Sequence, residues 1–207
     1  MFAGLGLPET TNQRFHLLSL RHGAPRLSTA FDSLTLYGLD SDEAGALAKI
    51  GEGGVAVDTI DDMLRLYDGF DLENTSVSMT MNGAVLPVLA AYVAAAEEQG
   101  VKQEQLNGTI QNDILKEYIA QKEYIYPPKP SMRLVTDVFS FCSDYVPRWN
   151  TISVSGYHIR EAGATALQEL AFTLRNGIEY VEFGMRSGLR PEQFVPRMSF
   201  FFNAHND

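Results

Sequence analysis

Short runs of β-branched, small and apolar residues alternate along the chain with longer segments whose apolar residues have helical spacing. The short runs predict strands at 27–31, 54–57, 76–80, 108–110, 152–155, 178–183 and 198–202. The longer segments predict helices at 9–21, 60–67, 85–99, 114–124, 132–145 and 161–175. Because the elements alternate without hairpin turn signals, they indicate parallel strands joined by helical crossovers. The pattern predicts an α/β fold, either an open doubly wound sheet or a β/α barrel.

Local signals mark where several of these elements begin and end. Thr59 has the character of an N-cap, and two aspartates follow it in the first turn of the helix at 60–67. Prolines at positions 127, 128 and 130 separate the helices at 114–124 and 132–145, because proline ends one helix and is tolerated at the start of the next. Residues 51–54 read GEGG, which lacks the spacing of a phosphate-binding loop and predicts a tight turn.

Small polar residues recur within the predicted strands or at their ends. They are Ser28, Ser78, Thr80, Thr109, Gln111, Ser155 and Ser199. In a β/α barrel the carboxyl ends of the strands and the loops after them form the active face. The repeated hydroxyl groups predict an interior that is not packed with Val, Ile and Leu alone, and a barrel that binds sugar phosphates would show a similar pattern.

Composition narrows the class of protein. With 45% hydrophobic residues, 207 residues can bury a sizeable core and suggest one domain or a large part of one. A formal net charge of −10 counts against nucleic acid as a partner. The single cysteine, Cys142, excludes an internal disulfide, fits a reducing compartment and is expected to be buried. Neither a signal-peptide pattern nor a run of 18 apolar residues occurs, so we expect a cytoplasmic location without a membrane partner.

Two long motifs are the most specific features of the chain. They read GTIQNDILKEYIAQKEYIYPPKP at 108–130 and TISVSGYHIREAG at 151–163. The others are LSTAFD at 27–32, GLDSD at 38–42, TSVSMTMNGAVLPVLAAYVAAAEEQG at 75–100 and FVPRMSFFFNAHND at 194–207. In this order and spacing the chain resembles the adenosylcobalamin-dependent acyl-CoA mutase family, which includes methylmalonyl-CoA and isobutyryl-CoA mutases.

The resemblance implies a TIM-type (β/α)8 barrel threaded by the pantetheine arm of coenzyme A. Residues 1–207 would form an incomplete acyl-CoA-binding barrel domain of a larger, oligomeric mutase. The family's D-x-H-x-x-G signature, which supplies the cobalt ligand, does not occur around His16, His22, His158 or His205. Adenosylcobalamin would therefore bind between this barrel and a cobalamin-binding domain or small subunit that provides that ligand.

By resemblance, His158 donates a hydrogen bond to the thioester carbonyl of the substrate and Gln111 assists it. Migration of that carbonyl group places extra electron density on its oxygen, and one preorganised donor is typically worth ~2–4 kcal/mol. Tyr157 would press against the adenosyl group when substrate binds. Without the resemblance, His158 would be read as a structural histidine and Tyr157 as a core or interface aromatic.

Other positions are assigned by the same resemblance. Substrate-binding positions are Ser28, Ser78, Thr80, Thr109, Asn150, Arg197 and Ser199, and cofactor-binding positions are Phe31, Ala120 and Glu161. Strand alternation would place Arg197 and Ser199 on the same face. The alternatives are local backbone hydrogen bonds for the small polar residues, a surface salt bridge for Arg197, a core aromatic for Phe31 and a helix N-terminal acid for Glu161.

Two positions bear on the acyl group. In methylmalonyl-CoA mutases the position of Gln121 is an arginine that pairs with the substrate carboxylate, and the position of Phe2 is a tyrosine. Their replacement predicts isomerisation of isobutyryl-CoA to butyryl-CoA, unless Gln121 faces solvent and Lys122 or another residue serves the carboxylate. The alternatives are a methylmalonyl-CoA to succinyl-CoA mutase, a non-catalytic acyl-CoA-binding fragment and an unrelated sugar-phosphate barrel enzyme.

Overall fold

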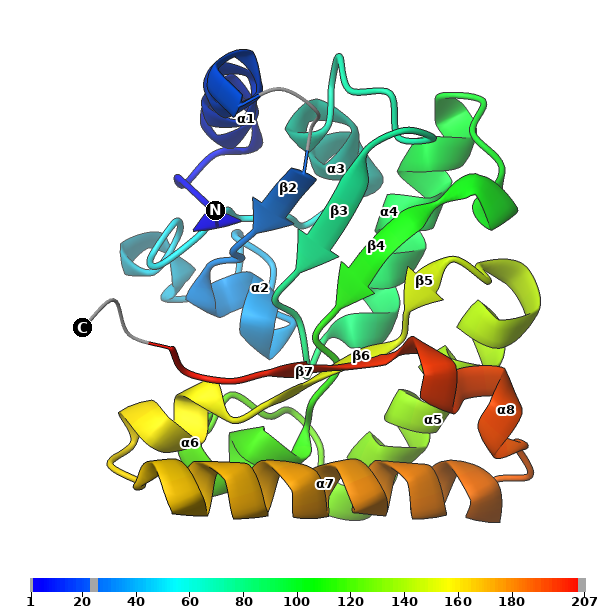
Figure 1. Ribbon diagram of the computed structural model, residues 1–207. Helices are drawn as coiled ribbons and strands as arrows, with labels where there is room; N and C mark the ends of the chain where they lie inside the picture. The colour runs from blue at the N-terminus through cyan, green and yellow to red at the C-terminus, as the bar shows by residue number, and fades with distance from the viewer. Residues whose placement is uncertain (1, 23–25, 205–207) are drawn as a thin grey trace.

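Parallel strands alternate with helices in the computed structural model, which describes residues 2–22 and 26–204 (Figure 1). The strands are β1 (Phe2–Ala3), β2 (Arg26–Thr29), β3 (Ser76–Met79), β4 (Asn107–Ile110), β5 (Trp149–Asn150), β6 (Ile152–Ser155) and β7 (Met198–Phe201). The α-helices are α1 (Pro8–His22), α2 (Ser33–Tyr37), α3 (Ile60–Leu66), α4 (Val85–Glu98), α5 (Pro128–Tyr145), α6 (Tyr157–Glu161), α7 (Ala166–Arg186) and α8 (Pro191–Phe194). The short helices are η1 (Ala46–Ala48), η2 (Gln103–Gln105), η3 (Glu117–Gln121) and η4 (Val195–Arg197).

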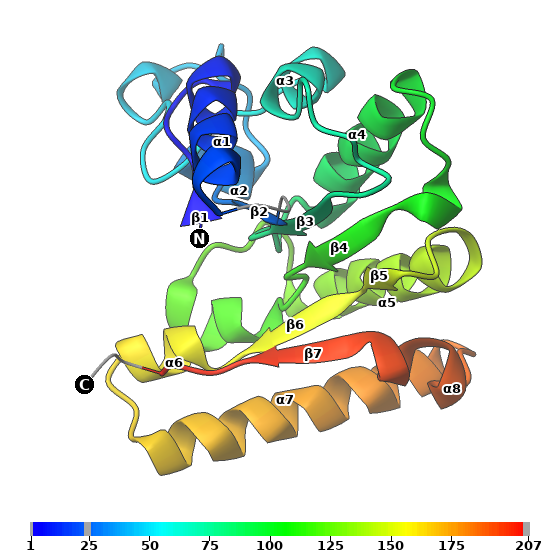
Figure 2. The same ribbon diagram turned by 45° about the horizontal axis from the view of Figure 1, so that its top comes forward.

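All paired strands are parallel, as the sequence predicts. One sheet has the order β1-β2-β3-β4-β5 and a second pairs β6 with β7. The two sheets are continuous, because the Ser153 amide donates to the Gln111 carbonyl at 2.9 Å and so extends the ladder from β4 to β6. Figure 2 shows β4, β6 and β7 side by side along this curled sheet. Strand order follows chain order throughout, which is the arrangement expected of part of a β/α barrel.

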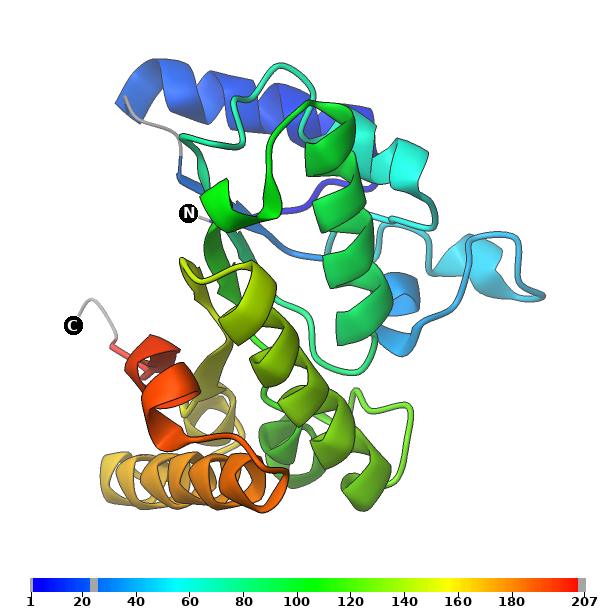
Figure 3. The same cartoon turned by 90° about the vertical axis from the view of Figure 1, so that its right-hand side faces the viewer.

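One face of the sheet is packed against helices. Leu27, Val77 and Ile110 point outward and are buried in a core shared with α1, α3 and α4. A second core lies between β6, α5, α7 and α8 and includes Phe139 and Tyr180. Figure 3 shows α1 (blue) and α7 (yellow to orange) at opposite ends, with α4 and α5 (green to yellow-green) between them. The helices therefore follow one another around the outside of the curved sheet.

Most of the predicted strands are confirmed, but two are not. Residues 54–57 form no strand, and Val55 makes only isolated bridges to Gly6 and Phe31. The strand predicted at 178–183 is wrong, because these residues lie inside the 21-residue helix α7. This helix buries small and polar residues, including Gly177 and Gly184, and leaves large apolar ones such as Ile178 exposed. The local apolar run therefore has the composition of a strand although its backbone is helical.

Four of the six predicted helices are confirmed with shifted ends, and those predicted at 114–124 and 161–175 differ in kind or extent. Thr59 caps α3 through a reciprocal capping box with Asp62. Helix α5 begins at Pro128, four residues before the predicted start, because a proline in the first turn needs no hydrogen-bonded amide. The helix predicted at 161–175 is instead α6 followed by α7, which starts at Ala166 after the N-cap Thr165.

Two minor sequence predictions are confirmed. Cys142 is buried, and burial raises the pKa of its thiol to about 12. The GEGG segment is a turn in which Gly51 and Gly53 adopt positive φ and the Gly51 amide donates to Asp32 Oδ2 at 2.8 Å. No helix in the described part of the chain is long and apolar enough to cross a membrane. His205 lies outside the described residues.

Candidate active site

A row of five residues crosses the face of the sheet that the helices leave uncovered. The register pairs Phe2 with Ser28, Ser28 with Ser78, Ser78 with Thr109 and Thr109 with Asn150, and every member is a predicted substrate-binding residue. Phe2 is 51% exposed and the other four are half-buried. Asn150 Nδ2 donates to Thr109 Oγ1 at 3.1 Å. The row thus forms a mildly polar strip inside the curve of the sheet, with the aromatic Phe2 at one end.

Two further hydroxyls have local partners. Thr80 Oγ1 donates to the Thr29 carbonyl at 3.1 Å, and Ser199 Oγ donates to the Ile152 carbonyl at 3.0 Å. The alternative of a backbone hydrogen bond is therefore realised at both positions. Their oxygens can still accept a hydrogen bond, because a hydroxyl that donates retains its lone pairs.

Arg197 lies at the amino end of β7, in the turn η4 rather than in the strand. The strand alternation predicted for Arg197 and Ser199 therefore does not apply. Arg197 is exposed and forms no salt bridge with any residue that the structure describes, so the surface ion pair is absent there too. Four residues further along, the Phe201 carbonyl accepts from the Gly156 amide at the carboxyl end of the sheet. At ~3.3 Å per residue, Arg197 and Phe201 are about 13 Å apart along the strand direction.

Gln111 follows β4 directly at this carboxyl end. It is 6% exposed, and its Oε1 accepts a hydrogen bond from Asn82 Nδ2 at 2.9 Å. The next residue, Asn112, has φ 50, a left-handed conformation that asparagine tolerates better than most residues. Asn112 Nδ2 donates to the Thr151 carbonyl at 3.0 Å and fixes this turn against the β5–β6 junction. The turn ends the strand and directs the chain into the next segment.

That segment, for which the sequence predicts an α-helix over 114–124, contains the π-helix η3. The π-helix aligns residues five apart, and Lys116 Nζ accordingly donates to Gln121 Oε1. Lys116 also forms an ion pair of 2.6 Å with Glu117 Oε1, and both side chains are 0% exposed. Lys122 ends the π-helix with φ 73. Single π-helical turns occur frequently at functional sites.

Gln121 is half-buried, and its side-chain amide is hydrogen-bonded into this network rather than free in solvent. Its Nε2 donates to Glu123 Oε2, while Glu117 Oε2 accepts from the Glu123 amide at 2.9 Å. Burial raises the pKa of both glutamates, and Lys116 opposes that shift in each. The network carries one positive and two negative groups when all three are ionised.

His158 lies in the first turn of α6, directly after β6, and α6 packs against η3. Its Nδ1 is buried without a hydrogen-bond partner among the described residues. Burial, and to a smaller extent the charge of Lys116, lowers the pKa of the imidazole to about 3. Tyr157 is 37% exposed, stacks on Phe201 at 5.2 Å and meets the His158 ring edge-on at 5.3 Å. A neutral histidine and a partly exposed tyrosine therefore stand together at the carboxyl end of the sheet.

Asp113 connects the loop after β4 with the end of β6 and with α7 through hydrogen bonds. Its Oδ2 accepts from the Ser155 amide at 2.6 Å, and its Oδ1 accepts from the hydroxyl of Tyr180 on α7. Tyr180 in turn accepts from the Leu115 amide at 2.8 Å. Burial raises the pKa of Asp113, and the hydrogen bond from Tyr180 opposes that shift. The loop after β4, the end of β6 and α7 are thereby held in one arrangement.

The predicted cofactor contacts differ in accessibility. Phe31 is 2% exposed and belongs to the core, so the core-aromatic alternative describes it. Ala120 is half-buried on η3, and Glu161 is exposed at the end of α6, where it accepts from Asn203 Nδ2. Glu161 is thus not the helix N-terminal acid of the alternative interpretation. Among the described residues no group of three or more His, Cys, Asp or Glu side chains could hold a metal ion.

Sequence reasoning missed four residues of the buried network: Asn82, Lys116, Glu117 and Glu123. The adjacent Lys116 and Glu117 carried no signal, because charged residues in an amphipathic segment are expected to be exposed and their burial depends on the pair they form in the fold. Asn82 carried no local signal, since its partners come from other parts of the chain.

Comparisons with known proteins give the same family over nearly the whole chain. The profile of the family described as Methylmalonyl-CoA mutase matches residues 1–207. The methylmalonyl-CoA mutase of Escherichia coli (strain K12) is 52% identical over 206 residues, which cover 100% of this chain and 29% of that protein. The methylmalonyl-CoA mutase large subunit of Propionibacterium freudenreichii subsp. shermanii is 52% identical over 201 residues, covering 97% and 28% respectively.

A probable mitochondrial methylmalonyl-CoA mutase of Caenorhabditis elegans is also 52% identical over 201 residues, covering 97% of this chain and 27% of that protein. The chain therefore spans between 27% and 29% of the length of these three relatives.

Proposed function

Since this chain belongs to the methylmalonyl-CoA mutase family, we propose that it forms the acyl-CoA-binding part of an isomerase that rearranges the carbon skeleton of a short-chain acyl-CoA. The observation that carries the proposal is the position of Gln111 and His158. Both follow parallel strands at the carboxyl end of the sheet, beyond the polar row on its uncovered face. Active sites of β/α barrels are built at that end.

The uncovered face suits the pantetheine arm of coenzyme A. Ser28, Ser78, Thr109 and Asn150 are small enough to leave room and can exchange hydrogen bonds with the amides of the arm. Arg197, exposed at the amino end and without an acidic partner in the described part of the chain, can pair with a phosphate of coenzyme A. The thioester then reaches the level of Gln111 and His158.

His158 and Gln111 act on the thioester carbonyl. Electron density on its oxygen rises while the carbonyl group migrates, and fixed donors in a site away from water stabilise that change without reorganising. The lowered pKa keeps His158 neutral, so it serves as a hydrogen-bond donor rather than as a source of a full proton. Because Nδ1 is buried without a partner among the described residues, we assign the proton to Nε2, which then donates to the carbonyl.

Adenosylcobalamin, when bound, supplies the radical that starts the rearrangement. The partly exposed Tyr157 and the accessible residues Ala120 and Glu161 fit a large ligand over the junction of α6 and η3, whereas the buried Phe31 does not. The cobalt ligand would come from a cobalamin-binding domain or small subunit within an oligomeric enzyme. We propose a cytoplasmic location from the single cysteine, which fits a reducing compartment; the Caenorhabditis elegans relative is mitochondrial by name.

For the acyl group, the names of the relatives support methylmalonyl-CoA and its isomer succinyl-CoA as the first candidate. Isobutyryl-CoA is a second candidate, supported by the network around Gln121. The cation bonded to Gln121 is Lys116, which is already paired with Glu117, and Gln121 itself is bonded to Glu123. The neighbouring Lys122 is exposed and donates to the Tyr118 carbonyl at 3.0 Å. A substrate carboxylate at this point would meet a neutral amide and a second carboxylate, which is unfavourable in a buried site.

The test uses the holoenzyme that contains this chain, loaded with adenosylcobalamin. We expect turnover of methylmalonyl-CoA or isobutyryl-CoA, and His158→Ala should lower kcat by about 10²-fold or more while changing KM far less. The ratio of kcat/KM for the two substrates then decides between them. If isobutyryl-CoA is preferred, Gln121→Arg combined with Phe2→Tyr should erode the preference, and Gln99→Arg, which adds the same charge on an exposed helix end, should not. Binding of acyl-CoA without turnover would contradict the enzymatic function.

A further inference from the structure

Asn82 occupies the centre of the buried network although it touches none of the groups that the proposed reaction uses directly, apart from Gln111. It follows β3, is 5% exposed and makes three side-chain hydrogen bonds. Its Nδ2 donates to Gln111 Oε1 at 2.9 Å and to Glu117 Oε1 at 2.7 Å, and its Oδ1 accepts from the Asp113 amide at 3.0 Å. One side chain therefore connects the loops after β3 and β4 with η3.

The chemistry of these partners leaves Asn82 only one orientation. An ionised carboxylate can only accept hydrogen bonds, and a backbone amide can only donate. Glu117 Oε1 accepts from Lys116 Nζ at 2.6 Å and Glu117 Oε2 accepts from the Glu123 amide at 2.9 Å, so both oxygens act as acceptors here. The NH2 group of Asn82 must therefore face Glu117, and its oxygen must face Asp113.

The orientation of the Gln111 amide is fixed in the same way. The second hydrogen of the Asn82 NH2 group points at the Gln111 side chain, so Gln111 must present its oxygen to Asn82. Its own NH2 group is then turned away from the network. This NH2 group forms no hydrogen bond with any residue that the structure describes, although Gln111 is 6% exposed.

We propose that Asn82 is a positioning residue, fixed by the buried Lys116–Glu117 pair, which orients the amide of Gln111 so that its NH2 group faces the acyl thioester. The inference rests on the proposed function, because it assigns Gln111 a substrate carbonyl to act on. An unconstrained glutamine amide could turn over and present its oxygen, which would repel the electron density that develops on the carbonyl. The Lys116–Glu117 pair fixes the orientation of the Asn82 amide, and Asn82 in turn fixes the orientation of the Gln111 amide. The donor is therefore preorganised before substrate binds.

Two substitutions in the holoenzyme test this role. Asn82→Asp keeps the shape of the side chain but replaces its donor by an acceptor, so Gln111 must turn its NH2 group inward. Asn82→Ala removes the constraint without adding a charge and serves where the acidic variant fails to fold. Asn176→Asp is the matched control, because Asn176 is also buried, at 8% exposure, and its Nδ2 has no partner among the described residues.

The first measurement is the infrared carbonyl band of propionyl-CoA, isotope-labelled at the thioester carbon and bound to the protein. Hydrogen-bond donors polarise the carbonyl and lower its stretching frequency. We expect the band to be shifted down in the wild type, to return toward the frequency of free ligand in both Asn82 variants, and to remain shifted in Asn176→Asp. The second measurement is kinetic: kcat should fall by about 10²-fold in the Asn82 variants with KM changed far less.

The outcomes separate this inference from the proposed function. If wild-type protein binds propionyl-CoA and shifts its band, but the Asn82 variants retain the full shift and the wild-type kcat, then Asn82 does not position Gln111. A uniform rise in KM with an unchanged band and kcat would likewise overturn the inference and make Asn82 a structural residue. If the wild type shows neither binding nor a shifted band, the proposed function itself is wrong.

Discussion

The surroundings of His158 keep its imidazole neutral well below physiological pH. Burial lowers its pKa to about 3, and the charge of Lys116 adds to the effect. A neutral imidazole offers one donor and one acceptor nitrogen. With Nδ1 buried and unpartnered in the described structure, a proton on Nε2 gives a ring that can donate outward to a ligand. The residue is therefore suited to hydrogen bonding throughout the catalytic cycle.

The lowered pKa of His158 makes the stability of the protein depend on pH. In the unfolded chain His158 has its ordinary pKa of about 6.5, so between that pH and about 3 the unfolded state binds more protons than the folded state. The contribution to stability is complete above about pH 6.5 and is lost as the pH falls through the window. We expect the thermal midpoint of the protein to fall more steeply from neutral pH to about pH 5 than that of His158→Gln. Parallel curves would mean that His158 is already protonated or solvated in the folded protein.

At the residue scale, sequence motifs predict the residues that we propose to face the ligand but not those that support them. The motifs alone predict all five members of the polar row, and the register places them side by side. They do not predict Asn82 and Glu123, because the roles of these two residues depend on hydrogen bonds to residues that the fold brings together. Gln121 is predicted as a site residue, but its burial is not, because that burial depends on a π-helical turn.

At the scale of elements, α7 shows how glycine permits close packing. A Cβ added at Gly184 would lie 2.6 Å from the ring of Phe194, which is 0% exposed and stacked on Phe139 at 5.1 Å. A Cβ added at Gly177 would lie 3.2 Å from the ring of Phe200, which is 46% exposed. The first ring cannot move without disturbing the core, and the second can move outward into solvent.

The two glycines therefore form a matched pair on one helix. We expect Gly184→Ala to destabilise the protein by roughly 1–3 kcal/mol, because overpacking outweighs the gain in helix propensity. Gly177→Ala should range from neutral to about 1 kcal/mol stabilising, because Phe200 can yield while alanine favours the helix. Urea unfolding of both variants beside the wild type measures the difference. Equal effects of the two substitutions would show that α7 is not held against Phe194 as the structure indicates.

Helix α7 is also where sequence reasoning about elements fails most clearly. The run at 178–183 has the apolar and β-branched composition of a strand. The face of α7 toward the core gives no regular apolar stripe, because apart from Tyr180 its buried residues are glycine, threonine, asparagine and glutamate. Apart from residues 54–57, the alternation of strands and helices elsewhere is predicted correctly because those elements bury their apolar side chains. An element whose apolar side chains lie outside violates that assumption.

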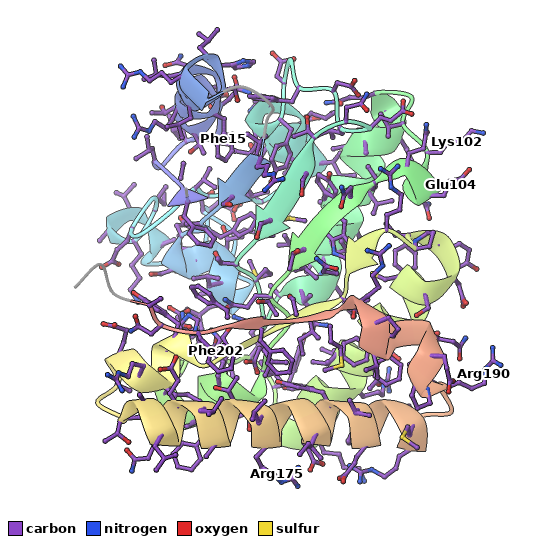
Figure 4. All side chains as sticks on the ribbon, in the orientation of Figure 1. Phe15, Lys102, Glu104, Arg175, Arg190 and Phe202 are labelled. Carbon is purple, nitrogen blue, oxygen red and sulfur yellow. The ribbon has the colours of Figure 1, made fainter. Side chains whose placement is uncertain are left out.

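At the scale of the whole molecule, the outer surface of α7 is unusual for a monomer. Leu167, Leu170, Leu174, Ile178 and Met185 are spaced three, four or seven residues apart, and each is at least 45% exposed. Arg175 projects from the same helix away from the sheet (Figure 4). The strand β7 pairs on one side only within the described residues, and Phe200 on it is exposed. Exposed apolar stripes and unpaired strand edges are sites of association.

We therefore expect the isolated 207-residue chain to self-associate and to be catalytically silent even with added adenosylcobalamin. Burial of the α7 stripe against another copy removes apolar surface from water, at about 25 cal/mol per Å². Size-exclusion chromatography with light scattering should show oligomers, and Leu170→Glu combined with Ile178→Glu should reduce them, because charges on the stripe must be desolvated on association. Gln99→Glu, which adds an acid to an exposed helix end elsewhere, should leave the oligomers unchanged.

A monodisperse monomer of the unmodified chain, or turnover without another polypeptide, would contradict the expectation. If oligomers persist in the double variant, the unpaired edge of β7 rather than the face of α7 drives association.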